Sequence, residues 1–187
     1  MALKLVSAPS IEPVTLAEVK ASLRLTDTSE DTLLANFIIA ARMDCEFKTG
    51  RALLTQSWRW TLDSFTELGE VPKPPLQSVT SVSYVDVNGV TQTLDSSAYR
   101  VDTDGEPGRM EPVDTQWPAT NTQVNAVTVL FTAGYGDASS DVPMPVRQWI
   151  ILAVGDMYAN RERSSAERLE ALAFADGLLD GATLWPR

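Results

Sequence analysis

The sequence predicts an α+β fold in which a helical platform, made of an N-terminal helical hairpin and C-terminal helices, carries a β-rich insertion. Two observations predict this class. Hydrophobic residues recur every three to four positions near both ends of the chain, which is typical of amphipathic helices. Between these regions, apolar and polar residues alternate with a period of two, as in strands that bury one face. We therefore expect residues 1–54 and 140–187 to form the platform and residues 55–139 to form the insertion.

Composition restricts the possible functions. The chain has 187 residues, a net charge of −10 and no histidine. A strongly acidic protein is poorly suited to gripping nucleic acid, and the lack of histidine excludes histidine-dependent triads and histidine zinc sites. The longest apolar run, Trp149–Val154, is far shorter than the roughly 18 residues of a membrane span. The N-terminus lacks the features of a secretory signal, so we expect no membrane association.

The platform is expected to begin with a short helix near residues 15–25. Pro9 and Pro13 disfavour helix before it, and the spacing of Thr15 and Glu18 predicts a capping box at its first turn. The residues that follow it, from 26 to 28, form the turn of a helical hairpin.

The second helix is expected over Thr28–Gly50. Thr28 has the character of an N-cap, and Gly50 can take the left-handed conformation that ends a helix. Arg42 and Glu46 fall on the polar side of this helix. The residues of its apolar face are Leu34, Phe37, Ile38, Ala41 and Cys45. The position of Cys45, the single cysteine, favours a core residue over a nucleophile.

After Gly50 the pattern predicts strands. Asn88-Gly89 lies between two β-prone runs and predicts a two-residue type I′ hairpin. The segments 103–112 and 114–123 are rich in turn-forming residues and are expected to be loops, and the acidic run Asp102–Glu106 is interpreted as a turn because its spacing does not match a calcium loop. The expected strands are Thr55–Leu62, Val79–Val87, Val90–Leu94, Ala98–Asp102 and Ala126–Thr132.

Helix is expected to return over Pro143–Arg163, with Pro145 in its first turn. A further short helix is expected over Ala166–Ala175. The tail beyond Ser164 is too apolar for a solvated segment. We expect Leu169–Trp185 to be mobile or loosely docked in an isolated monomer and to become ordered between subunits.

No catalytic, cofactor-binding or metal-binding pattern is present, so the sequence predicts a protein that is not an enzyme. Gly134 and Gly136 do not form a phosphate loop, because Pro143 precedes the next helix. Exposed tryptophan is a favoured anchor of protein interfaces. The candidate interface residues are therefore Trp117, Tyr135, Leu169, Leu172, Leu178, Leu179, Leu184 and Trp185.

Several segments, in order along nearly the whole chain, resemble one protein family. The sequence is similar to head–tail connector (adaptor, or head-completion) proteins of long-tailed bacteriophages, in the subgroup with a β-rich insertion. The segments that carry the resemblance include PVTLAEVKASLRL, DTLLANFIIAARMDCEFKTGRALLTQSWRWTLDSF, PPLQSVTSVSYVDVNGVTQTL, VTVLFTAGYGD, VPMPVRQWIILAVGDMYANRE and the terminal LWPR.

The resemblance implies a structural virion protein, made in the bacterial host cytoplasm, that forms a homo-oligomeric ring, commonly dodecameric. The ring would lie between the portal protein and a tail-side completion or tail-terminator protein, and DNA would pass through it without specific binding. The resemblance also implies that the chain from Ser164 onward reaches a neighbouring subunit or the portal. Two alternatives remain open: a monomeric β-domain that binds a ligand, and a hydrolase that uses carboxylates.

Overall fold

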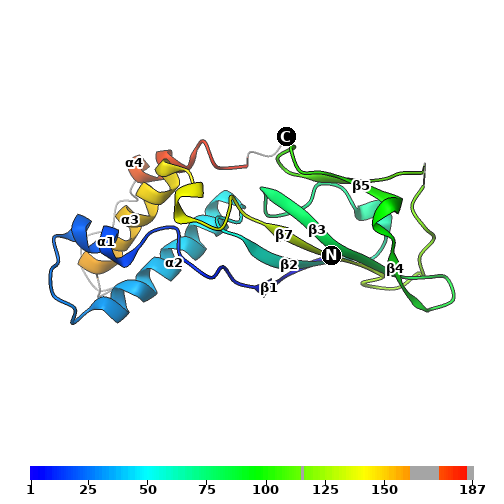
Figure 1. The fold of residues 1–187 in the computed structure, drawn as a ribbon, viewed down its shortest axis with the longest axis horizontal. Helices are drawn as coiled ribbons and strands as arrows, with labels where there is room; N and C mark the ends of the chain where they lie inside the picture. The colour runs from blue at the N-terminus through cyan, green and yellow to red at the C-terminus, as the bar shows by residue number, and fades with distance from the viewer. Residues whose placement is uncertain (115, 161–172, 185–187) are drawn as a thin grey trace. The chain divides into compact units, whose positions relative to one another are not determined.

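The computed structural model describes residues 1–114, 116–160 and 173–184 (Figure 1). The chain divides into two compact units, and each unit combines two separate stretches of sequence. A sheet unit is drawn from Met1–Pro9 and Thr55–Tyr135, and a helical unit is drawn from Ser10–Leu54 and Gly136–Arg187. Helices and an antiparallel sheet together confirm the predicted α+β class.

The sheet unit is built on five antiparallel strands in the order β1-β2-β7-β3-β4. The strand β7 lies at the centre and pairs with β2 on one side and with β3 on the other. The bounds of the strands are Ala2–Ser7 for β1, Gln56–Leu62 for β2, Leu76–Val85 for β3, Thr91–Leu94 for β4 and Val127–Ala133 for β7.

The first strand lies in a segment that the sequence predicts to be extended, but its pairing in the sheet was not predicted. Met1–Pro9, assigned from the sequence to the helical platform, lies in the sheet unit because β1 pairs with β2, with Ala2 opposite Thr61 and Leu5 opposite Trp58. Its residues are mostly exposed, so β1 lacks the alternation of apolar and polar residues that marks a half-buried strand.

Burial alternates along the central strand as the period of two predicts. Val127, Val129, Phe131 and Ala133 of β7 are buried, and the residues between them are only half-buried. These side chains lie on one face of the sheet because successive residues of a strand point to opposite faces. The expected strand over Ala126–Thr132 is therefore confirmed within one residue of its bounds.

The predicted hairpin between β3 and β4 is present, but its turn is longer than expected. Val85 pairs with Thr91, and the Asp86 N–H donates to the Val90 carbonyl at 2.9 Å, which leaves a three-residue loop. Gly89 has a φ of +80°, whereas Asn88 does not take a positive φ, so the turn is not type I′. The Asp86 carboxylate braces the longer loop by accepting from the N–H groups of Asn88 (2.9 Å) and Val90 (3.0 Å).

A second, two-stranded sheet pairs β5 (Tyr99–Asp102) with β6 (Arg109–Pro112). The sequence predicts a loop over the residues of β6, and that prediction was wrong. Backbone pairing with β5 and burial of Met110 hold this short, charged strand in place. The turn predicted at Asp102–Glu106 is confirmed, because Asp102 Oδ1 accepts from the N–H groups of Asp104 (3.0 Å) and Gly105 (3.1 Å).

The helical unit contains α1 (Leu16–Leu23), α2 (Asp31–Thr49), α3 (Met144–Ala159) and the short α4 (Ala173–Asp176). The capping box predicted at Thr15 and Glu18 is present. Glu18 also forms an ion pair with Arg147 of α3, and Arg147 Nε donates to the Pro13 carbonyl at 3.0 Å. These contacts connect the start of α1 to α3.

The long helix α2 begins later than the sequence predicts. Thr28 does not cap it: the helix begins at Asp31, its N-cap is Glu30, and no side chain caps it. Asp27 forms a turn instead by accepting from the Ser29 N–H at 3.1 Å, and Lys20 of α1 pairs with Asp31 at 2.6 Å. Gly50 ends the helix with a φ of +73°, as predicted.

The core of the helical unit lies between α1, α2 and α3, and includes Val19, Leu34, Ile38, Ile150 and Val154. Cys45 is buried in α2, and this burial raises the pKa of its thiol to about 12, so the thiol is protonated and unreactive at neutral pH. Among the described helices, none is both long and apolar enough to cross a lipid bilayer.

Candidate assembly surface

The sheet unit contains one of the two tryptophans proposed from the sequence as interface anchors. Trp117 is half-buried, and its ring stacks on Phe65 with the centroids 4.9 Å apart and the planes at 2°. Phe65 in turn contacts Tyr84 of β3, with the centroids 5.5 Å apart. One side of Trp117 therefore covers the aromatic cluster of its own unit. Tyr135, the last residue of the sheet unit, is also half-buried.

The apolar tail residues divide into described and undescribed ones. Leu179 is buried in the helical unit, whereas Leu178 and Leu184 are half-buried. Ala175 and Ala182 are buried with Leu179. Leu169, Leu172 and Trp185 lie outside the described residues, as does most of the short helix expected over 166–175.

Polar contacts hold the described part of the tail against the helices. Trp149 Nε1 of α3 donates to Asp176 Oδ1 at 3.1 Å, and Arg51 Nε donates to the Ala182 carbonyl. The Leu184 N–H donates to the Thr49 carbonyl at the end of α2 at 3.5 Å. The residues from 173 to 184 thus pack into the helical unit, whereas the sequence predicts a mobile or loosely docked tail over Leu169–Trp185.

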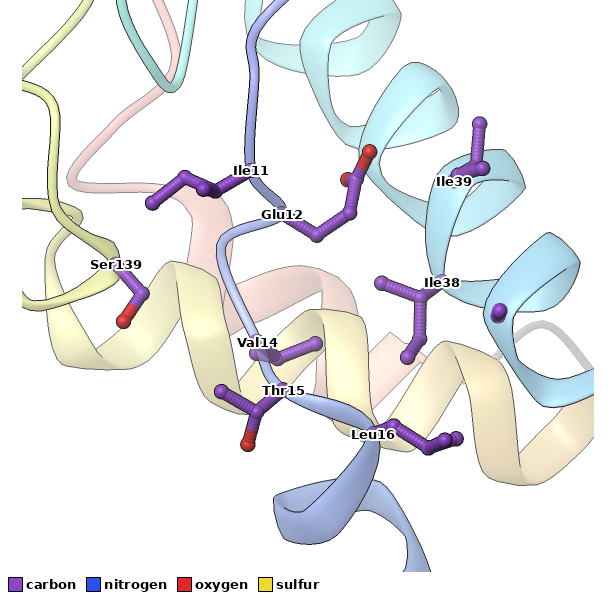
Figure 2. Close-up of a pocket in the computed structure, with 9 residues that line it drawn as sticks. Ile11, Glu12, Val14, Thr15, Leu16, Ile38, Ile39 and Ser139 are labelled. Atoms are coloured by element: carbon purple, nitrogen blue, oxygen red, sulfur yellow. The ribbon is translucent and has the colours of Figure 1, made fainter. Parts of the chain in front are cut away.

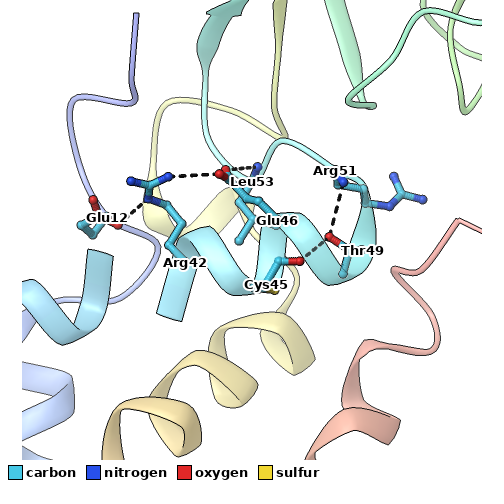
Figure 3. Close-up of polar contacts among 7 residues, drawn as sticks. All are labelled: Glu12, Arg42, Cys45, Glu46, Thr49, Arg51 and Leu53. Carbon is cyan, nitrogen blue, oxygen red and sulfur yellow. Dashed lines mark hydrogen bonds and ion pairs between the residues drawn. The ribbon is translucent and has the colours of Figure 1, made fainter. Parts of the chain in front are cut away.

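A buried polar network lies near the C-terminal end of α2 (Figure 3). Arg42 and Glu46, placed by the sequence analysis on the polar side of the helix, are both buried. Arg42 donates to Glu12 at 2.8 Å and to Glu46 at 3.0 Å, and the second oxygen of Glu46 accepts from the Leu53 N–H at 3.0 Å. The spacing of four residues between Arg42 and Glu46 is the sequence signal for this pair. Their distant partners leave no such signal.

The network connects three segments of the helical unit. It joins the extended chain before α1, the helix α2 and the loop after α2 through Glu12, Arg42, Glu46 and Leu53. Each buried charge faces an opposite charge or a backbone donor, which is the condition under which burying it is tolerable. The network therefore has a structural role.

The perturbed carboxyls serve as caps and turn anchors. The pKa of Glu18 is lowered, first by the hydrogen bond from the Thr15 N–H, and the pKa of Asp86 is lowered, first by that from the Val90 N–H. A lowered pKa keeps a carboxyl ionised at neutral pH, which suits a cap better than a general acid. Within the described ranges, no three acidic or cysteine side chains are grouped closely enough to hold a metal ion.

One face of α2 carries apolar side chains into solvent. Ile39 is 39% exposed, Met43 is 59% exposed and Phe47 is 84% exposed. These residues are four positions apart, so they lie along one stripe of the helix. The stripe was not predicted from the sequence, although its regular spacing is visible there. We call it the α2 stripe.

An apolar groove adjoins the α2 stripe (Figure 2). It has a volume of about 380 Å³ and lies between α2 and the extended chain that leads into α1. Its single charged lining residue, Glu12, is paired with Arg42. Its apolar lining comes from Ile11, Val14, Leu16, Ala35, Ile38 and Ile39.

Comparison with protein families places this fold in a known class. Residues 13–104 match the profile of the phage gp6-like head–tail connector protein family. The matched region, close to half of the chain, includes α1, α2 and the strands β2 to β5. A comparison with curated proteins gives no match.

Solved structures match the chain over its entire length. A chain in the neck of an empty gene transfer agent particle, computed with C6 symmetry, has 26% sequence identity and a TM-score of 0.84, with 100% of this chain and 97% of that chain covered. A chain in the virion of a native gene transfer agent particle has 25% identity and a TM-score of 0.80 over the same coverage. A third, in the neck of a native particle computed with C12 symmetry, has 22% identity and a TM-score of 0.77, and it shows the shared fold.

The fold and these comparisons define a structural protein of a phage-type virion. More narrowly, the chain is a head–tail connector protein, and its place is the head–tail junction. The family resemblance seen in the sequence is thereby confirmed.

Proposed function

We propose that copies of this chain assemble into a ring, of twelve subunits, that joins the portal of the filled head to the tail. The observation that supports this best is the full-length likeness to a chain in a particle neck computed with C6 symmetry. A ring of twelve identical subunits contains a six-fold axis, so it is compatible with that symmetry.

The proposed ring contacts the portal protein on its head side and a tail-side completion or tail-terminator protein on the other. We propose that the part of the chain from Ser164 onward contributes to these contacts or to those with a neighbouring subunit. Trp117, Tyr135, Leu178 and Leu184 retain exposed surface in the single subunit, which makes them candidates for such contacts. Leu179 is less suitable, because its side chain is already buried within its own subunit.

We propose that the chain works mechanically and has no catalytic role. The support is the use of its perturbed and buried ionisable groups: Glu18 caps a helix, Asp86 braces a turn, and Arg42 and Glu46 connect segments of the helical unit. These contacts stabilise the fold of a subunit that other chains bind to on both sides.

Native mass spectrometry tests the proposal directly. The purified protein is measured alone and with the portal protein of the same phage, over a range of protein concentrations. We expect a closed oligomer with a mass of twelve subunits, formed alone or on the portal. A chain that remains monomeric at all concentrations and never binds the portal would contradict the proposal and favour the alternative of a monomeric binding module.

A further inference from the structure

The outward face of α2 is unusual for a helix exposed to water. The helix has eight exposed residues, and only Asp44 and Lys48 among them are charged. Solvent-facing helix surfaces are normally polar or charged. The remaining exposed residues are Thr32, Asn36, Ile39, Ala40, Met43 and Phe47.

The net charge of the chain makes this face, which has few charged residues, significant. Each copy of the chain carries a net charge of −10, so two copies repel one another unless they meet through surfaces poor in carboxylates. The α2 stripe offers such a surface. The adjoining groove does too, because its one carboxylate, Glu12, is neutralised by Arg42 at 2.8 Å.

The stripe and the groove match in apolar character and in size. Among the described residues of the helical unit, Phe47 is the most exposed large apolar side chain, and aromatic side chains of this kind are frequent interface anchors. A dry apolar cavity of about 150 Å³ is large enough to hold benzene, so a groove of about 380 Å³ has room for a phenyl ring. Figure 2 shows Val14 and Ile38 converging on this groove from the extended chain and from α2.

Phe47 cannot fill the groove of its own chain. Ile39 lies at the edge of the groove and is eight residues before Phe47 on the same helix, which corresponds to a separation of about 12 Å along the axis. Phe47 therefore reaches such a groove only in another copy of the chain. A contact between two different patches of identical chains is heterologous, and repetition of such a contact closes into a ring when the rotation allows it.

We infer that Phe47 of one subunit inserts into the groove lined by Ile11, Val14 and Ile38 of the next subunit, and that this contact repeats around the ring. The inference rests on the proposed ring, and it identifies the surfaces that build it. Met43 and Ile39 extend the contact along the α2 stripe.

Disulfide trapping tests the contact. The double variant Ile39→Cys/Phe47→Cys places one thiol beside the groove and one at the end of the stripe. The two thiols are too far apart on one helix to bond within a chain, and the buried Cys45 does not compete. We expect mild oxidation to give a ladder of linked dimers, trimers and higher species. The control Phe47→Cys/Met144→Cys, with Met144 65% exposed elsewhere in the helical unit, should give no such ladder.

A mixing experiment separates a lost contact from a damaged fold. Phe47→Glu removes the inserted side chain and Ile11→Glu blocks the groove, so each variant alone should associate roughly tenfold or more weakly than the unmodified protein. Mixed together, the two variants should form a dimer that does not grow, because one intact Phe47 meets one intact groove. A Met144→Glu variant should assemble normally.

The outcomes distinguish the contact from the ring itself. A ladder no stronger than that of the control, or normal rings from Phe47→Glu, would overturn the contact while leaving the proposed ring in place. Failure of the unmodified protein to form an oligomer, alone or on the portal, would overturn the proposed function and the contact together.

Discussion

At the level of single residues, Arg42 is a charged residue that the sequence pattern assigns to the surface but that is buried in the fold. Hydrophobic periodicity assigns charged residues to the solvent side of a helix, yet Arg42 and Glu46 are buried because they neutralise each other and Glu12. The sequence predicts the contact between Arg42 and Glu46, because residues four positions apart are neighbours on a helix. It does not supply Glu12, which lies 30 positions away and meets Arg42 only in the folded chain.

Removing the buried guanidinium should therefore be costly. We expect Arg42→Met to lower the free energy of unfolding by about 3–5 kcal/mol, because it leaves two carboxylates without their cationic partner in a largely buried site. Urea denaturation measures the change. Arg59→Met, at an exposed position of β2, is the matched control and should change stability by about 0.5 kcal/mol or less. Equal effects of the two variants would show that the network contributes little.

Glu18 makes a contribution to the free energy of unfolding that decreases as the pH falls. Its pKa lies below the ordinary value of 4.5, first because of the hydrogen bond from the Thr15 N–H and also because of Arg147. A carboxyl with a lowered folded-state pKa stabilises the fold above its unfolded-state pKa, and that stability is lost as the pH falls through the folded-state value.

We expect Glu18→Gln to be less stable than the unmodified protein at pH 7, and the difference to vanish at a pH well below 4.5. The side chain is 38% exposed, so solvent screening limits the difference at pH 7 to about 0.5–1 kcal/mol. Thermal unfolding monitored by circular dichroism from pH 3 to pH 7 follows it. A difference independent of pH would assign the effect to side-chain packing instead of charge.

At the level of elements, the sequence predicts the hairpin between β3 and β4 correctly but not the type of its turn. The β-prone runs on both sides of Asn88-Gly89 predict the hairpin, and the hairpin is present. The turn type depends on Asp86, whose carboxylate accepts two backbone N–H groups and stabilises a three-residue loop. The type I′ turn was predicted from Asn88-Gly89 alone, without the Asp86 side chain, and that prediction was wrong.

The two turn types predict different responses to alanine at Asn88 and the same response at Gly89. Gly89 has a φ of +80°, where a Cβ is strained, so we expect Gly89→Ala to destabilise the protein by about 1 kcal/mol. Asn88 lacks the positive φ that a type I′ turn requires, so Asn88→Ala should be nearly neutral. Chemical denaturation of both variants tests this. A cost at Asn88 equal to that at Gly89 would support the two-residue turn.

The tail is another element whose role depends on tertiary contacts. Its apolar composition fits an interface segment as well as a core segment, and the structure places Ala175, Leu179 and Ala182 in the core of the helical unit. Periodicity could not distinguish the two cases, because both need the same residue types.

Two adjacent leucines provide a matched test of this packing. Leu179→Ala should lower the free energy of unfolding by about 2–4 kcal/mol, because it leaves a cavity at a buried site. Leu178→Ala, at a half-buried neighbour, should cost clearly less. The melting temperature of the isolated protein reports both. A negligible loss for Leu179→Ala would indicate the loosely docked tail that the sequence suggested.

At the level of the whole molecule, the sequence predicts the elements with strong local patterns. The α+β class, the long helix α2 and the central strand β7 follow from periodicity alone. The strands β1 and β6 do not follow from periodicity, because few of their residues are buried. Backbone pairing holds them to partner strands that periodicity cannot identify. The α2 stripe was not predicted for a different reason. Its spacing is regular, but apolar residues on a helix are ordinarily assigned to the core, and these are exposed.

The net charge leads to a prediction about DNA. A ring of subunits that each carry −10 has a strongly anionic field, which repels phosphate over about a Debye length, roughly 8 Å at physiological salt. We expect an acidic inner wall and negligible binding of duplex DNA by the assembled ring, as measured by fluorescence anisotropy at several salt concentrations. A basic DNA-binding domain serves as the positive control. Salt-sensitive binding in the submicromolar range would require a cationic track and would contradict the prediction.

The central position of β7 also determines when the protein can fold. On the ribosome, β1 and β2 emerge early, and β3 and β4 follow, but these two pairs have no connection until residues 127–133 join them. The helix α3, which completes the helical unit, emerges later still. A nascent chain therefore presents open sheet edges for most of its synthesis. Neither unit can therefore be complete before the last third of the polypeptide has been synthesised.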